Sequence, residues 1–156
     1  MAIPGTTGTT FEIGTKATDA ASDTYTSVAG ATQLGVFGDS ATLISFITLD
    51  DSRVRKQKGS RNAGQLNPQF AFDALNAGIQ AVVAAGADDS ATPYNMRITL
   101  TDTPASGSAP TATVFTFKGF VMGTPLDVSQ ADNPVTLSPT IEIDTIVSLN
   151  LAATGD

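Results

Sequence analysis

The chain has 156 residues, enough for one domain with a buried core, and 41% of them are hydrophobic while 15% are charged. It contains no cysteine and no histidine, which excludes disulfides, thiolate metal sites and catalysis by a histidine base. The formal net charge of −7 disfavours stable binding to nucleic acid or to other anions.

Alternation of apolar and polar residues predicts a chain built mainly from β-strands. In the first third, we expect short strands at residues 10–14 and 33–37. Residues 42–49, TLISFITL, are apolar on both faces of a strand. A strand of that kind is either buried on both sides or in contact with a partner chain.

The next segment, DDSRVRKQKGSR at residues 50–61, holds five of the eight basic residues of the chain. It lies between the apolar strand and a predicted strand at residues 65–72, so we predict a long hairpin loop at about residues 50–64. The formal charge of the chain falls from −7 to −12 without these five cations. The cations are Arg53, Arg55, Lys56, Lys58 and Arg61.

Three interpretations of this basic loop are open. It is a solvated loop, a phosphate-binding segment, or a contact to the acidic body of another copy of the chain. No aromatic residue lies among the cations, which disfavours nucleic-acid binding. A basic tip facing an acidic body favours head-to-tail contacts, which produce rings or filaments.

One helix is predicted at about residues 74–85, where Leu75, Ile79, Val82 and Val83 share one face. Asp73 is its expected N-cap. Further strands are expected at three segments of the second half, residues 94–101, 113–122 and 135–151. The fold class is therefore mainly β: a sandwich or barrel of about eight strands with one flanking helix.

We expect a single domain over residues 1–156, with flexible ends at residues 1–9 and 152–156. The N-terminal residues lack the basic and apolar regions of a secretory signal, and the chain has no apolar run of the length that spans a membrane. We therefore expect no signal peptide and no membrane contact.

The sequence contains no convincing catalytic pattern. Glu142 and Asp144 lie two residues apart on one strand face, without a third ligand at a useful spacing. Ser40 in GDSAT has no histidine to activate it, and GTTGTT is not followed by the lysine of a phosphate loop. We predict no catalytic, cofactor-binding or metal-binding residues and expect the protein not to be an enzyme.

The order of segments resembles the major tail tube protein of long-tailed bacteriophages with non-contractile tails, or of related tail-like particles. The most specific part covers residues 48–86, with Thr48-Leu49-Asp50 at a strand end, Gly64 after the loop, Phe72-Asp73 after an extended strand, and then the helix. More distantly, the chain resembles the tube proteins of contractile tails and of type VI secretion. The family often carries a further C-terminal immunoglobulin-like domain, which we do not expect here.

The resemblance implies hexameric rings, stacked head-to-tail as a hollow tube that conducts DNA into the host. Implied partners are the chain itself and the tape-measure, terminator and tail-tip proteins, while DNA only passes through. The location would be the virion tail, after assembly in the bacterial cytoplasm. In this arrangement we expect the five cations to contact the adjacent ring, and Glu142 and Asp144 to line an acidic lumen.

Two other classes remain as alternatives. The first is a β-sandwich binding module of the adhesin or carbohydrate-binding type, although sugar sites favour exposed aromatics and the chain has no tryptophan and two tyrosines. The second is another tail component, such as a terminator or a contractile-tail tube protein.

Overall fold

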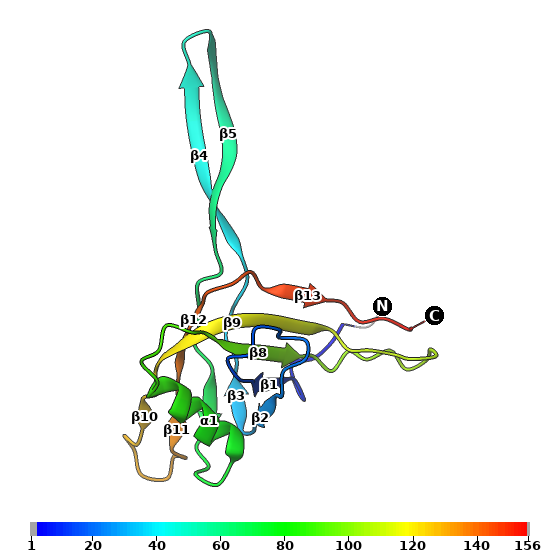
Figure 1. The fold of residues 1–156 in the computed structure, drawn as a ribbon, viewed down its shortest axis with the longest axis vertical. Coiled ribbons are helices and arrows are strands. Elements are labelled where there is room, and N and C mark those ends of the chain that lie inside the picture. The colour runs from blue at the N-terminus through cyan, green and yellow to red at the C-terminus, as the bar shows by residue number, and fades with distance from the viewer. Residues whose placement is uncertain (1–2, 156) are drawn as a thin grey trace.

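A computed structural model describes residues 3–155, which form thirteen strands and one helix (Figure 1). The strands in the first half are β1 (Thr10–Ile13), β2 (Thr26–Val28), β3 (Ala31–Gln33), β4 (Ser40–Thr48), β5 (Asp51–Asn62), β6 (Gln65–Leu66) and β7 (Gln69–Ala71). Those in the second half are β8 (Tyr94–Thr99), β9 (Val114–Gly123), β10 (Leu126–Asp127), β11 (Thr136–Leu137), β12 (Thr140–Ile143) and β13 (Ser148–Asn150). The helix is α1 (Ala77–Gly86).

The body of the protein is a sandwich of two antiparallel sheets with α1 on one flank. Sheet A has seven strands in the order β2-β1-β8-β9-β12-β6, and β13 pairs with β9 beside β12. Sheet B has four short strands in the order β10-β11-β7-β3. The predicted class, mainly β with one flanking helix, is confirmed. Among the described residues, no helix has the length and hydropathy needed to cross a membrane.

The core lies between the two sheets and α1. On each long strand of sheet A, alternate residues point inward, as the period of two predicts. The rings of Phe11 on β1 and Phe70 on β7 join the two sheets, with centroids 5.7 Å apart. Both side chains are fully buried, so they mark the centre of the sandwich.

The helix begins three residues later than predicted, because a different side chain caps it. The Asn76 side-chain oxygen accepts a hydrogen bond from the Ile79 backbone N–H at 3.1 Å, which is the N-cap contact. Asp73, the expected cap, instead accepts a hydrogen bond from the Leu75 backbone N–H at 3.0 Å in the preceding turn. Ile79 and Val82 are buried as predicted, whereas Leu75 lies outside the helix and is exposed.

Prolines and a glycine shorten the other predicted strands. Pro68 separates β6 from β7, and Pro139 separates β11 from β12, because proline has no N–H for a β-ladder. The strand expected at residues 33–37 is β3, which ends at Gln33. Gly35 has a φ of 87°, which extended strands do not adopt.

The predicted long hairpin is present, but its loop is much shorter than residues 50–64. Residues 51–62 form β5, which pairs with β4 from Thr48↔Asp51 to Ser40↔Asn62, and the turn lies at Leu49 and Asp50. The basic segment is thus strand rather than loop. It contains one apolar side chain, Val54, so burial gives no sequence signal for it, and pairing with β4 makes it extended.

The predicted flexible ends fall partly outside the described residues, since residues 1, 2 and 156 are not described. Within the described part, Ala153 forms an antiparallel bridge with Thr111.

Gly78 provides a test of the packing between the helix and sheet A. A Cβ at this position would lie 2.2 Å from the Ser27 carbonyl oxygen and 2.6 Å from the Val28 Cα. Although alanine has the higher helix propensity, we expect Gly78→Ala to lower the free energy of unfolding by about 1–3 kcal/mol.

Urea denaturation measures this change. Gly123→Ala is the matched control, because no atom lies within 4 Å of an added Cβ there, and it should stay within about 0.5 kcal/mol of the wild type. Stabilisation by Gly78→Ala would contradict the close approach of α1 to β2.

Candidate assembly surfaces

The most conspicuous surface of the protein is the hairpin of β4 and β5, residues 40–62, which we call the arm. It projects from the body on the side opposite to β10 and β11 (Figure 1). Its strands pair only with each other and form a separate two-stranded sheet. An isolated two-stranded hairpin is marginally stable in water, so the arm requires a further contact.

Strand β4 exposes apolar side chains on both faces. Of the side chains of Leu43 and Ile47, 62% and 63% are exposed, and Ile44 and Phe46 are 46% and 44% exposed. The sequence left two possibilities for this strand, burial on both sides or contact with a partner. Burial on both sides is wrong, since these four side chains are exposed, and contact with a partner stays a prediction.

Strand β5 carries the positive charge along the length of the arm. Lys58 pairs with Leu43, Lys56 with Ser45, and Arg61, at the root, with Ala41. The expected basic tip is therefore a basic edge. The turn itself carries Asp50, whose pKa is lowered by a hydrogen bond from the Thr48 side chain.

One of the five cations has a carboxylate partner within the described residues. The Arg55 guanidinium donates to Asp51 Oδ2 at 2.7 Å, next to the turn. No ion pair is found there for the other four, which are Arg53, Lys56, Lys58 and Arg61. Four cations on one exposed strand leave a positive field that an acidic surface would complement.

The arm joins the body through two glycines with left-handed backbone geometry. Gly38 has φ 144° and Gly64 has φ 74°, and no atom lies within 4 Å of an added Cβ at either position. Backbone conformation, not packing, therefore requires glycine here. A hollow of about 140 Å³ beside this root is lined by Asp39, Arg61 and Asp144, among others.

The predicted lumen residues lie outside the core. Glu142 is half-buried on the face of sheet A that points away from the core, where it accepts a hydrogen bond from the Gln65 side-chain amide. Asp144 is exposed one residue beyond the end of β12. It shares the root hollow with Arg61, so the structure brings together two residues that the sequence assigned to separate sites.

Much of the remaining outward face of sheet A is covered by the segment at residues 14–25. The Lys118 ammonium donates to the Thr18 carbonyl at 2.8 Å, and the Asn95 side-chain amide donates to Asp23 Oδ2 at 2.7 Å. No local sequence pattern predicts this cover, because each contact joins residues at least 70 positions apart.

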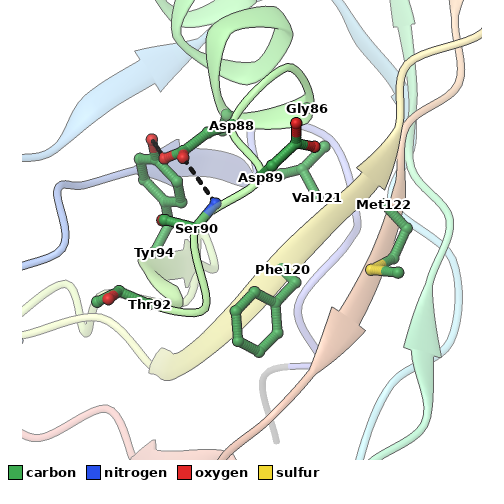
Figure 2. A pocket seen from close by; sticks show the side chains of 10 residues that line it. Gly86, Asp88, Asp89, Ser90, Thr92, Tyr94, Phe120, Val121 and Met122 are labelled. Atoms are coloured by element: carbon green, nitrogen blue, oxygen red, sulfur yellow. Dashed lines mark hydrogen bonds between the residues drawn. The ribbon is translucent and has the colours of Figure 1, made fainter.

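A second hollow, of about 330 Å³, lies between the end of α1, residues 88–92 and β9 (Figure 2). Its main polar group is Asp88, which pairs with Lys16 and accepts hydrogen bonds from the Tyr94 hydroxyl at 2.8 Å and the Ser90 backbone N–H at 3.0 Å. These donors, Lys16 above all, hold the pKa of Asp88 well below its usual range.

The Asp88 cluster has a structural role. Its carboxylate joins Lys16, the Tyr94 hydroxyl and the Ser90 backbone, and thereby ties three segments of the chain together. Across residues 3–155, no group of three or more acidic residues is placed to hold a metal ion. Within the described residues, the arm is the surface that combines exposed apolar side chains with four cations that form no ion pair.

Comparison with known proteins places the fold. No family model matches the chain, and no curated protein sequence matches it. Several solved structures do, including the following three. A component of the anti-feeding prophage baseplate has a TM-score of 0.70 at 9% identity, with 97% of this chain and 98% of that chain covered. A component of the sheath/tube terminator of an extracellular contractile injection system, PVC, has a TM-score of 0.67 at 10% identity, with 96% and 98% covered.

The third structure is the SPP1 tail tube, with a TM-score of 0.60 at 11% identity, covering 95% of this chain and 77% of that chain. The chain has the fold of tail tube proteins. At these identities the likeness concerns the fold, and it agrees with the resemblance found in the sequence.

The low pKa of Asp88 predicts how the stability of the protein depends on pH. Because the pKa of Asp88 is lower in the folded state than the usual value of about 4, its contribution to stability is present above about pH 4 and is lost as the pH falls below that value. We expect Asp88→Asn to lower the urea midpoint at neutral pH and to reduce the further loss of stability on acidification.

The measurement is urea unfolding at neutral pH and at about pH 2.5. Asp89→Asn, which removes the neighbouring carboxylate, is the control and should behave as the wild type does. Equal loss of stability on acidification in Asp88→Asn and the wild type would show that the Asp88 contacts do not contribute to stability at neutral pH.

Proposed function

We propose that this protein is a structural tail protein that assembles into hexameric rings, stacked as a hollow tube through which DNA passes. The observation that carries the proposal is the arm, which exposes one apolar strand and one basic strand and has no layer of its own to pack against. The similarity in fold to a tail tube supports the proposal.

The charges of the chain support assembly from identical copies. The arm carries five cations and two carboxylates, whereas the rest of the chain carries three cations and thirteen carboxylates, a formal charge of −10. A basic arm on one copy and an acidic body on the next make a contact between unlike surfaces. Such heterologous contacts close into rings or extend into filaments.

The proposed role of the second site is to line the lumen. Glu142 and Asp144 lie outside the core, and neither forms an ion pair within the described residues. An acidic wall would repel DNA and let it pass without binding. The proposed partners are further copies of the chain and the tape-measure, terminator and tail-tip proteins, in a virion tail assembled in the bacterial cytoplasm.

A tube component of a contractile particle is the second candidate. It is favoured by the similarity to baseplate and terminator components of contractile systems, which have higher TM-scores than the SPP1 tail tube. A component of that kind would also be structural and not an enzyme. Polymers that grow without limit separate a tube protein from a terminator, which stays as a single ring.

The basic strand gives the direct test of assembly. We expect the purified wild type to form hollow tubes or stacked rings at high concentration in negative-stain electron microscopy. Arg53→Glu, Arg55→Glu and Lys56→Glu combined should keep the unfolding midpoint, because these side chains are exposed, and should abolish the tubes.

The control variant carries Asp89→Lys, Asp127→Lys and Asp132→Lys, which reverse three charges outside the arm, and it should still form tubes.

Salt near 1 M, where the Debye length is about 3 Å, should weaken assembly of the wild type. Tubes of normal length from the arm variant would contradict the proposed role of β5. A wild type that stays monomeric at every concentration would count against the proposed tube.

The lumen has its own test. We expect tubes of a Glu142→Lys, Asp144→Lys variant to hold short duplex DNA in a form protected from nuclease, because a basic wall binds phosphates. Tubes of the wild type should protect none. The matched control is Asp89→Lys with Asp132→Lys, and equal protection by the control would place Glu142 and Asp144 away from the lumen.

A further inference from the structure

One hollow on the body is an uncharged groove, to which the proposed function assigns no role. Its volume is about 700 Å³, and it runs between the N-terminal segment, the segment at β3 and the end of β8. Its lining residues are Thr6, Thr7, Gly8, Thr9, Ala31, Thr32, Gln33, Leu34, Gly35, Val36, Phe37, Ile98 and Leu100. None of these side chains is charged.

We propose that this groove receives strand β4 from the arm of a second copy of the chain. The inference rests on the proposed self-assembly and names the surface that accepts the arm. Within one copy the arm points away from the body (Figure 1), so the occupant must come from another molecule.

The first argument is chemical match. Strand β4 has nine residues, SATLISFIT, none of them charged, and it exposes four large apolar side chains. The groove offers Val36, which is 92% exposed, and the half-buried Leu34 and Phe37. When these two surfaces are buried against each other, no charged side chain leaves water, whereas burial of β5 would take charged side chains out of water.

The second argument is the free edge beside the groove. Strand β3 is an edge strand of sheet B, paired on one side with β7, and β4 is paired on one side with β5. Each therefore has an unpaired row of backbone N–H and C=O groups, and an extended strand that binds along such an edge satisfies them. Strand β3 has three residues, which at about 3.3 Å each present roughly 10 Å of free edge to a strand of nine residues.

The third argument is charge. In the sequence, Asp39 and Asp102 follow the lining residues Phe37 and Leu100 by two residues, and no carboxylate lines the groove itself. Hydrogen bonds from Thr113 lower the pKa of Asp102 and keep it ionised. When β4 fills the groove, the cations of β5 lie beside it, where acidic neighbours complement them.

Engineered cysteines test the contact, because the chain has none of its own. One preparation carries Phe46→Cys on the arm and the other carries Val36→Cys in the groove, with affinity tags of different size. We expect the mixture, once oxidised, to yield a cross-linked product containing one copy of each. The control replaces Val36→Cys by Val128→Cys, a site that is also exposed but lies beside β10.

Each outcome decides the proposal. Cross-linking to position 36 and not to position 128 supports it, and cross-linking to position 128 alone overturns it. Absence of any cross-link at every concentration also overturns it. Tubes that form without the cross-link would reject the groove as the binding site and leave the proposed function intact. The cross-link without rings or tubes would support the groove and count against the proposed function.

A substitution in the groove gives an independent reading. Val36→Asp places an unpaired carboxylate in the proposed contact, so the concentration needed for assembly should rise about tenfold or more. Val128→Asp is the matched control and should leave that concentration unchanged. Equal effects of the two variants would show that added negative charge, and not the groove, is responsible.

Discussion

The two strands of the arm cannot bury their apolar side chains on each other, and this constraint governs the behaviour of the whole protein. A hairpin has two faces and no layer of its own, and β4 places apolar groups on both. The body cannot provide the cover, because the arm projects away from it (Figure 1). In the proposed assembly, a second molecule provides that burial.

The body is complete without the arm. Its core joins sheet A, sheet B and α1 through side chains such as Phe11 and Phe70, and all sixteen hydrophobic side chains of that core except Ala63 belong to elements of the body. The arm is attached through Gly38 and Gly64, outside both sheets. Changes in the arm are therefore separable from folding, which makes assembly variants of this protein interpretable.

Sequence patterns predicted what local chemistry determines. The period of the helix, the alternation on β8 and β12 and the effect of Pro68 were all legible. The N-cap was misplaced because Asp73 and Asn76 are both good caps, and tertiary packing decided between them. The long strand β5 was missed because it is held by pairing and not by burial. The groove has no local signal, since its lining comes from three distant parts of the chain.

The free edge of β4 is uncharged and that of β5 is cationic, and this difference limits how many further strands can add to the sheet of the arm. An apolar strand with a free edge is a hazard, because identical strands can add to it without limit and form a fibril. Strand β5 closes the other edge with Lys56, Lys58 and Arg61, and the like charges of two such edges repel each other. A partner that covers β4 thus leaves a hydrated, positive edge outward, and the sheet of the arm does not continue into an amyloid-like ribbon.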